Sequence, residues 1–294
     1  MSAYEHAFWS SRDGLRLHYR DYGGPADKPP LLCLPGLTRN CRDFENLAER
    51  HAGQWRMLCP DMRGRGDSAY ARDSATYIPL QYVEDVELLL DAAGVDRFVA
   101  VGTSLGGLIS AILALKHPQR LAGALLNDIG PVIEPAGLQR VCEYVGQGRS
   151  FTTWMHAARA LEEVHGEVYP QFDLPDWVAM AKRTMAVGQN GRIVFDYDMK
   201  IAEPFSRHRE GPPLDLWPAF AALAGRPVLV LRGALSDLLS AATLDDMLAR
   251  LPGAEGVTIP NVGHAPTLDE PEARAAIDRF LASLATDNAS QSLG

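Results

Sequence analysis

One short stretch of sequence, from Phe98 to Ile109, constrains the fold of this chain more than any other feature. It has the pattern of a buried strand, a tight turn and the start of a helix, with Ser104 at the centre of a G-x-S-x-G motif. A turn of this shape holds the serine hydroxyl clear of the sheet and leaves no room for side chains at Gly102 and Gly106. The stretch therefore predicts a sheet whose rim carries an exposed serine hydroxyl.

Short apolar runs alternate with helix-patterned segments on both sides of this stretch, which is typical of βαβ units and a parallel sheet. The predicted buried strands are residues 31–34, 57–60, 97–101, 122–127, 227–232 and 256–259. The predicted helices are residues 43–51, 80–92, 105–116, 244–251 and 270–284. Near the beginning of the chain, Arg12-Asp13-Gly14 predicts a turn that joins strands over 6–10 and 15–22 into a hairpin.

The alternation breaks over residues 131–213, which are helical in pattern, rich in Met and aromatic residues, and interrupted by prolines. We interpret this block as a helical insertion into a core domain formed by residues 1–130 and 214–294. Most of its large side chains are expected to pack the insertion against the core, and Trp154 is the first candidate for lining an apolar substrate pocket. Arg192, in a predicted turn, is a second candidate, for meeting a substrate carboxylate, although a solvated charge is the simpler interpretation.

Composition and charge exclude several classes of function. The net charge of −9 and the lack of a Lys/Arg run disfavour nucleic acid as a partner. No stretch reaches the roughly 20 apolar residues that span a bilayer, and the first residues lack the pattern of a signal peptide. The four cysteines have no CxxC spacing and are interpreted as reduced thiols, so we expect a cytoplasmic protein with no membrane partner. No metal or cofactor is expected, because no metal-binding spacing such as HExxH occurs.

A serine hydroxyl is a poor nucleophile unless a base accepts its proton and a carboxylate orients that base. His264 is the predicted base, because it lies in a Gly/Pro-rich loop after the last predicted strand. Asp237, in the loop after the strand at 227–232, is the preferred carboxylate, although it could instead cap the helix that follows. Asp128, at the end of the strand at 122–127, is the alternative acid, because both strand ends are expected at the same edge of the sheet.

A nucleophilic serine of this kind also needs two N–H donors for the negative charge of the tetrahedral intermediate. The amide of Leu105, directly after the serine, is one predicted donor. The other should come from the turn after the strand at 31–34, where Pro35 has no N–H. Leu37 is therefore preferred to Gly36 as the second oxyanion donor. The alternative is that Pro35-Gly36 is an ordinary turn.

Taken together, Ser104, Asp237 and His264, in that chain order, resemble the catalytic triad of the α/β-hydrolase family. The segment 61–68 is similar to that family's loop after its fourth strand, and the resemblance runs from about residue 31 to residue 284. It implies an α/β fold with an eight-stranded, mostly parallel sheet, helices on both faces and a helical cap inserted after the sixth strand. Most relatives carry His-Gly where this chain has Pro35-Gly36, which leaves the backbone donor intact.

Within that family the chain is most similar to the capped branch of esterases, enol-lactonases, C–C bond hydrolases, epoxide hydrolases and haloalkane dehalogenases. The last two activities use an aspartate nucleophile where this chain has Ser104. The resemblance therefore implies hydrolysis of a small or medium carboxylic ester or lactone through an acyl-serine intermediate, without a cofactor. The expected partner is this small-molecule substrate, and a homo-oligomer is compatible with the sequence.

Three alternatives stay open. The same triad could cleave a C–C bond in a diketone or a ring-fission product. A receptor-like member of the same fold could bind a small ligand with little turnover. The third is a dinucleotide site, since glycines follow a strand, but the G-x-x-x-G-G pattern over residues 102–107 lacks the second glycine of G-x-G-x-x-G.

Overall fold

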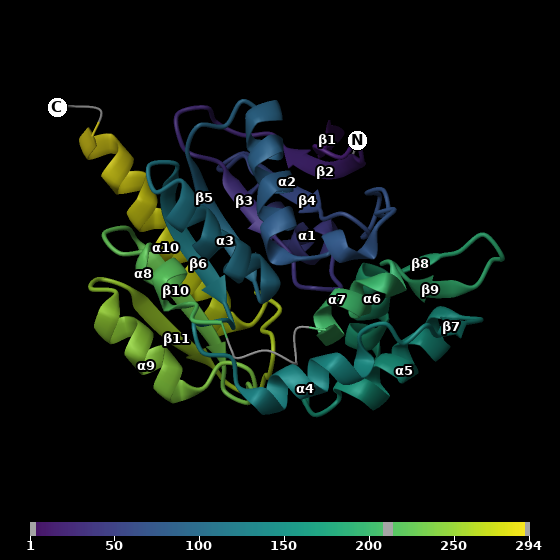
Figure 1. The fold of residues 1–294 in the computed structure, drawn as a ribbon. Coiled ribbons are helices and arrows are strands. Elements are labelled where there is room, and N and C mark those ends of the chain that lie inside the picture. The colour runs from purple at the N-terminus through teal and green to yellow at the C-terminus, as the bar shows by residue number, and fades with distance from the viewer. Residues whose placement is uncertain (1–3, 208–213, 292–294) are drawn as a thin grey trace.

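The computed structural model describes residues 4–207 and 214–291 of the 294-residue chain. Its core is an eight-stranded sheet with the order β1-β2-β4-β3-β5-β6-β10-β11 (Figure 1). The pairs β1–β2 and β2–β4 are antiparallel and every other neighbouring pair is parallel, which confirms the predicted fold class. The strands are β1 (Glu5–Ser10), β2 (Arg16–Tyr22), β3 (Leu31–Leu34), β4 (Met57–Asp61), β5 (Phe98–Thr103), β6 (Leu121–Asn127), β10 (Val228–Gly233) and β11 (Glu255–Ile259).

Side chains alternate along β3 in a way that shows the sheet to be buried on both faces. Leu32 and Leu34 belong to one hydrophobic cluster, whereas Leu31 and Cys33 belong to the other, and all four are fully buried. The first face is covered by α2 (Pro79–Ala92), α3 (Leu105–Lys116), α8 (Trp217–Ala221) and α9 (Ala241–Arg250). The second face is covered by α1 (Glu45–His51) and α10 (Pro271–Gln291) (Figure 1).

The predicted core strands and helices are all present, and most bounds differ from the predictions by a few residues. Helix α3 has the predicted bounds, and the predicted hairpin is formed by β1 and β2. Helix α9 begins three residues earlier than predicted, because the hydroxyl of Ser240 accepts a hydrogen bond from the amide of Thr243 and caps the helix there. Short 3₁₀ turns, η1 (Cys41–Phe44) and η2 (Ser74–Thr76), precede α1 and α2.

Between β6 and α8 the chain forms a lobe, residues 131–207, that lies to one side of the sheet (Figure 1). Its helices are α4 (Pro135–Tyr144), α5 (Trp154–His165), α6 (Leu174–Thr184) and α7 (Ala202–Arg207), with a 3₁₀ turn η3 (Met199–Ile201). The lobe also contains an antiparallel sheet that the sequence analysis did not predict, formed by β7 (Ser150–Phe151), β8 (Met185–Val187) and β9 (Ile193–Phe195). Strands of two or three residues are too short to show an alternating pattern. Residues 208–213 of the predicted insertion lie outside the described residues.

The lobe has its own apolar cluster and is fastened to the core by hydrogen bonds. Trp177, which is 1% exposed, lies in that cluster. Asn40 Nδ2 and Arg42 Nε both donate to the carbonyl oxygen of Arg183, at 3.1 and 2.9 Å. Arg42 also pairs with Asp196 of the lobe at 2.6 Å. The segment around η1 therefore sets the position of the end of α6.

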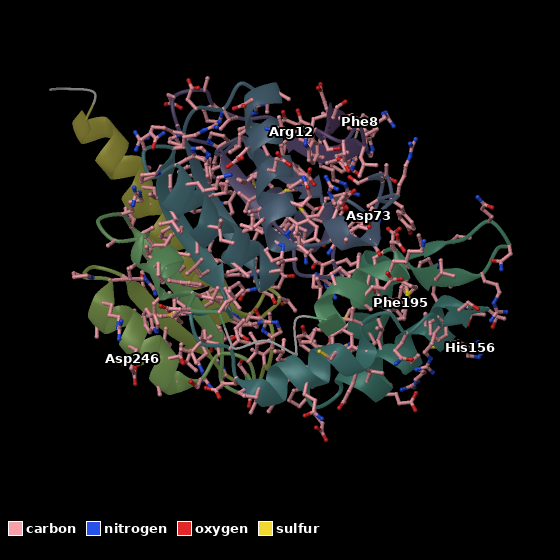
Figure 2. All side chains as sticks on the ribbon, viewed as in Figure 1. Phe8, Arg12, Asp73, His156, Phe195 and Asp246 are labelled. Atoms are coloured by element: carbon pink, nitrogen blue, oxygen red, sulfur yellow. The ribbon has the colours of Figure 1, made fainter. Side chains whose placement is uncertain are left out.

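Side chains fill the space between the sheet and its helices, and polar ones point outward around the whole molecule (Figure 2). His156 on α5 and Asp246 on α9 are both exposed and lie at opposite ends of this view. Among the described helices, none combines the length and the apolar composition needed to cross a bilayer.

Candidate active site

Ser104 lies at a sharp turn between β5 and α3, where its backbone is strained. Its φ of 53° and ψ of −116° are unusual for a residue with a side chain. A Cβ at Gly102 would collide with the backbone of Gly106, and a Cβ at Gly106 would collide with the carbonyl oxygen of Leu34. The turn therefore requires glycine at both positions, for the steric reason that the sequence analysis gave.

His264 lies in the loop after β11, with its imidazole directed at Ser104. The distance from His264 Nε2 to Ser104 Oγ is 2.9 Å, although the two residues are 160 positions apart in the chain. Only 7% of the His264 side chain is exposed to solvent. The residue predicted as the base is thus within hydrogen-bonding distance of the predicted nucleophile.

The carboxylate that meets His264 belongs to Asp128, and the preference for Asp237 was wrong on this point. His264 Nδ1 lies 2.7 Å from Asp128 Oδ2, and the Asp128 side chain is fully buried. Asp237 is instead held by two hydrogen bonds from Arg140 of α4, at 2.6 and 2.8 Å. Those hydrogen bonds hold the pKa of Asp237 below its ordinary value.

The backbone explains why one aspartate reaches the imidazole and the other does not. Strands β6 and β10 are neighbours, so both of their carboxyl ends lie at the edge where His264 sits. Asp128 follows β6 directly and has a φ of 58°, a left-handed conformation that aspartate tolerates better than most residues. Asp237 lies four residues beyond the end of β10, where the lobe supplies Arg140 as its partner.

Two further donors hold the Asp128 carboxylate in a fixed orientation. The amide of Gly233 donates to Oδ1 at 2.8 Å. The hydroxyl of Ser236 donates to Oδ2 at 2.6 Å, on the same oxygen that meets His264. Ser236 is in turn fixed by the amides of Leu238 and Leu239, which donate to its Oγ. Within residues 4–207 and 214–291, no Lys or Arg forms an ion pair with Asp128, and both of its carboxylate oxygens have hydrogen-bonding partners.

The two residues predicted to supply the oxyanion donors line one cavity together with Ser104. Leu105 is the first residue of α3, and Leu37 lines a cavity together with Ser104. A Cβ on Gly36 would lie 3.8 Å from the Cβ of Ser104, so the loop of Leu37 runs close beside the serine. Among the described residues, neither amide donates to a backbone acceptor outside regular helices and strands. Both are available to a negatively charged oxygen formed at Ser104.

A buried arginine that the sequence analysis did not single out holds the loop of Leu37. Arg65 Nε and Nη2 donate to the carbonyl oxygen of Leu37 at 2.9 and 2.7 Å. Its Nη1 donates to the carbonyl oxygen of Arg63 and to the hydroxyl of Tyr82. Arg65 is fully buried, in the segment 61–68 whose resemblance to the family was noted without a role. It restricts the loop through a planar, two-pronged contact that a lysine could not reproduce.

Two chambers of different character meet at Ser104. The apolar chamber measures about 210 Å³ and the polar chamber about 120 Å³, and both touch Ser104, Leu37 and Val141. The apolar chamber is lined by Leu37, Tyr77, Ile78, Pro79, Tyr82, Ser104, Leu105, Leu108, Ile129, Ile133, Leu138, Val141, Pro204 and Leu238. The polar chamber includes Arg39, Asp43, Tyr144, His165, Tyr169, Arg183 and His264. A larger hollow, lined by residues 23–30 and 94–97, lies at the amino ends of the strands, away from Ser104.

The two lobe residues proposed for the pocket lie elsewhere. Trp154 packs against the lobe's own apolar cluster and lines neither chamber. It is the first residue of α5, whereas the last residue of that helix, His165, lines the polar chamber. Arg192 is half-buried and donates to the hydroxyl and carbonyl oxygens of Ser150, beside β9. The lobe residues that line the polar chamber were not predicted: Val141, Tyr144, His165, Tyr169, Met180 and Arg183.

Two groups that line the polar chamber, His165 and Arg39, have shifted pKa values. Burial, together with the nearby positive charges of Arg39 and Arg140, lowers the pKa of His165 to about 4. His165 is therefore neutral at pH 7. Arg39 is held by Asp43 in a two-pronged ion pair at 2.6 and 2.7 Å, which raises its pKa despite burial.

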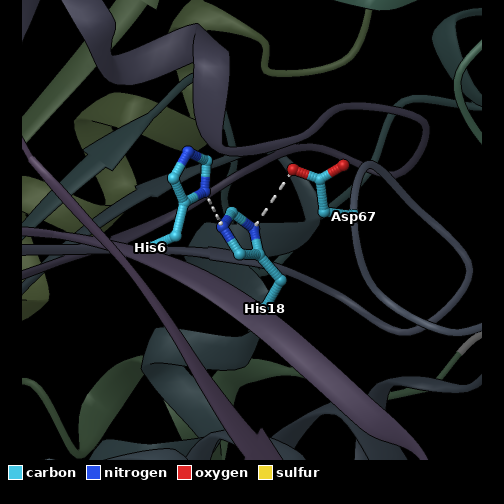
Figure 3. A group of neighbouring side chains, drawn as sticks. All are labelled: His6, His18 and Asp67. Carbon is cyan, nitrogen blue, oxygen red and sulfur yellow. Dashed lines mark hydrogen bonds and ion pairs between the residues drawn. The ribbon is translucent and has the colours of Figure 1, made fainter. Parts of the chain in front are cut away.

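A histidine cluster connects β1 and β2 to the segment 61–68. Figure 3 shows the His18 ring between His6 and Asp67. His18 Nε2 lies 2.8 Å from His6 Nδ1, whereas Asp67 is 4.0 Å from the other ring nitrogen. That nitrogen is already bonded to the buried Asp61 at 2.7 Å. Both ring nitrogens thus have hydrogen-bonding partners, so we interpret the cluster as a structural network.

Asp61 connects this network to η1, which follows the loop of Leu37. Its Oδ1 accepts a hydrogen bond from the amide of Cys41 at 2.8 Å, and its Oδ2 accepts one from the amide of Asp67 at 3.0 Å. Burial alone would raise the pKa of Asp61, but the hydrogen bonds from His18 and from these two amides bring it below the ordinary value. The carboxylate is therefore kept charged and anchors the start of η1.

Comparison with known proteins agrees with this fold and site. The model of the α/β hydrolase fold family matches residues 29–271. The chain belongs to this family, and it is a hydrolase of the α/β hydrolase fold. The family resemblance seen in the sequence is thereby confirmed.

Several relatives of this chain are named as hydrolases or esterases. The 3-hydroxybutyrate-oligomer hydrolase of Cupriavidus necator is 34% identical over 275 residues, covering 90% of this chain and 92% of the relative. The pimeloyl-[acyl-carrier protein] methyl ester esterase of Xanthomonas campestris pv. campestris is 28% identical over 264 residues, covering 87% of this chain and 96% of the relative. The crystal structure of an α/β hydrolase from Novosphingobium aromaticivorans matches with a TM-score of 0.92 and 60% identity, covering 96% of this chain and 99% of that one.

Proposed function

We propose that the protein is a serine hydrolase that cleaves a small or medium carboxylic ester or lactone through an acyl-serine intermediate. The observation that carries this proposal is the continuous chain of hydrogen bonds from Ser104 through His264 to Asp128, at 2.9 and 2.7 Å. An imidazole between a hydroxyl and a buried carboxylate is the arrangement that makes a serine nucleophilic at neutral pH.

In the proposed reaction each group has a defined part. His264 Nε2 accepts the proton of Ser104 as Oγ attacks the ester carbon, and the carbonyl oxygen becomes negative facing the amides of Leu37 and Leu105. His264 then returns the proton to the leaving alcohol. Water, deprotonated by the same imidazole, attacks the acyl-serine and releases the acid. Asp128 stays ionised and stabilises the imidazolium that forms twice in the cycle.

The names of the relatives support an ester as the bond that is cleaved. One relative is named for hydrolysis of 3-hydroxybutyrate oligomers, and another for hydrolysis of a methyl ester. Both names describe carboxylic esters, and both relatives are matched over most of their length. Esters of short acids are therefore the first substrates to test.

Labelling with a fluorophosphonate probe tests the proposal directly. Intact-protein mass spectrometry should show one adduct on Ser104, together with loss of hydrolysis of p-nitrophenyl butyrate. The variant Ser104→Ala should gain no adduct and should lose activity, while Ser110→Ala, a change on the buried face of α3, is the matched control for labelling. An unlabelled wild-type protein would overturn the proposal.

Two other outcomes would favour the alternatives that the sequence left open. Labelling of Ser104 combined with a strong preference for a vinylogous diketone over p-nitrophenyl butyrate would indicate a C–C hydrolase. Labelling with negligible turnover across a panel of acyl chain lengths and lactone ring sizes would indicate a ligand-binding protein on the same fold.

A further inference from the structure

The position of His264 fixes how an ester lies across Ser104. In the proposed reaction the leaving alcohol must take its proton from His264 Nε2, so the alcohol portion lies on the side of the imidazole. His264 lines the polar chamber and does not line the apolar one. The alcohol portion of the substrate therefore occupies the polar chamber, and the acyl portion occupies the apolar chamber.

The apolar chamber suits a short acyl chain. Its lining is almost wholly hydrophobic and includes Leu105, Leu108 and Ile129. Its volume of about 210 Å³ exceeds the roughly 150 Å³ of an engineered apolar cavity that takes up benzene. An acyl group of a few carbons fits this space, and a charged group there would lose its hydration without a partner.

The polar chamber, in contrast, offers a guanidinium with unused hydrogen-bonding capacity. Arg183 lines the chamber with its side chain only 20% exposed, and its nearest carboxylate, Asp269, is 3.8 Å away. Among the described residues, its guanidinium donates no hydrogen bond. Its backbone is fixed, since its carbonyl oxygen accepts two hydrogen bonds from Asn40 and Arg42. A half-buried arginine that is held in place and lacks a full set of acceptors is matched by a carboxylate of the ligand.

Other groups of the polar chamber also favour a negatively charged ligand group. Tyr144 and His165 are in edge-to-face contact, with ring centroids 5.1 Å apart, and within the described part of the chain neither makes a side-chain hydrogen bond. Arg39 uses Nε and Nη2 on Asp43, and its Nη1 donates no hydrogen bond to any residue that the structure describes. The carboxylate that lines this chamber, Asp43, is thus neutralised by Arg39. The remaining donors point to an anionic ligand group.

We propose that the substrate is the ester of a hydroxy acid, in which the leaving alcohol carries a carboxylate that Arg183 binds in the polar chamber. This inference rests on the proposed serine hydrolase function. Water is added across the ester bond, so the products are a short-chain acid and a free hydroxy acid, and no oxidant or other co-reactant takes part. Arg183 acts on substrate binding and orientation, whereas the bond-breaking steps belong to Ser104 and His264.

A matched pair of substrates tests the charge preference. The butyrate ester of 3-hydroxypropanoate carries the carboxylate, and the butyrate ester of 3-hydroxypropanamide replaces it with a neutral group of similar shape. We expect kcat/KM of the wild-type protein to favour the carboxylate by at least about tenfold, the usual scale for one charge-assisted hydrogen-bonded contact. Arg183→Gln should bring that ratio close to one, and Arg183→Lys should restore part of it.

Arg192→Gln is the matched control, because Arg192 is also a lobe arginine but binds Ser150 away from both chambers. Its ratio should equal that of the wild type, and unfolding temperatures of all variants should show that they are folded. An equal rate for the two wild-type substrates would overturn the inference, as would an unchanged ratio in a folded Arg183→Gln variant. Fluorophosphonate labelling of Ser104 in the same preparations would show that the hydrolase proposal itself still holds.

The direction in which the ester lies is tested separately. Monomethyl glutarate places its carboxylate on the acyl side, where the structure offers the apolar chamber. We expect kcat/KM for this substrate to be at least about tenfold below that for methyl butyrate. A preference for monomethyl glutarate would show that the carboxylate enters with the acyl group and would overturn the orientation.

Discussion

Replacing Asp128 by asparagine exchanges one carboxylate oxygen of the proposed triad for an NH₂ group. The effect of this change on catalysis can be predicted from the hydrogen bonds around Asp128. The amide of Gly233 donates to Oδ1, so the carbonyl oxygen of an asparagine would stay at that position. The NH₂ group would then face His264 Nδ1 and donate to it. That contact places the remaining imidazole proton on Nε2, facing Ser104, where the base must accept a proton. Asp128→Asn therefore holds the imidazole in the tautomer that cannot act as a base.

The magnitude follows from the role of the carboxylate in a triad. The corresponding change in a serine protease lowers kcat by about 10⁴, which is roughly 5 kcal/mol of transition-state stabilisation. We expect a fall of that order for Asp128→Asn. The matched control is Asp237→Asn, whose side chain is 34% exposed and bound to Arg140. It should change kcat by no more than about threefold, because it loses a partly exposed ion pair.

The assay is the steady-state hydrolysis of p-nitrophenyl butyrate, with the rate of fluorophosphonate labelling measured in parallel. Both rates should fall together in Asp128→Asn, since both depend on deprotonation of Ser104. Urea denaturation shows whether each variant remains folded. A folded Asp237→Asn variant that loses as much activity as Asp128→Asn would refute the assignment of the acid.

Two further predictions concern residues outside the triad. Arg65→Lys should lower kcat by about 10- to 100-fold and leave KM within threefold, because the variant loses the two-pronged contact to Leu37. The control Arg63→Lys should reduce the unfolding temperature without that fall in kcat. An equal fall in kcat for both variants would contradict the role of Arg65 in holding the loop of Leu37. The pKa of His165 is about 4 in the folded protein and 6.5 in its ordinary state. Between these two pH values the unfolded chain binds more protons than the folded protein. The free energy of unfolding therefore falls as the pH drops from about 6.5 to 4. His165→Gln should show a shallower loss of unfolding free energy over that range in urea titrations, and parallel curves for variant and wild type would contradict it.

The sequence was sufficient to select Ser104 and His264, which the structure brings within hydrogen-bonding distance, because each has a local signal. Ser104 sits in a strand–turn–helix stretch whose glycines are required by backbone contacts, and His264 follows the last strand of the sheet. It was not sufficient to choose between Asp128 and Asp237, because strand order brings both to one edge. The choice depends on the left-handed turn at Asp128 and on Arg140, a lobe residue 97 positions from its partner.

Features that depend on tertiary contacts were missed for the same reason. Leu37 was predicted because Pro35 lacks an N–H, but Arg65, which holds its loop, acts across 28 positions of chain. Trp154 was selected as a large aromatic residue of the insertion, yet size alone does not say which face of α5 it occupies. The helical pattern of the insertion was visible, whereas its short strands were not.

The hydrogen bonds between η1 and the end of α6 tie the lobe to the segment that follows the loop of Leu37. Asn40 is 1% exposed, caps η1 and lies three residues after Leu37. If the lobe swings away to admit an ester, Asn40 and Arg42 must release the carbonyl of Arg183. Opening would then loosen the segment that follows an oxyanion donor and displace the arginine that faces the alcohol portion. The open molecule could bind substrate but would be poorly arranged to cleave it. Closure of the lobe would then be the step that completes the catalytic arrangement.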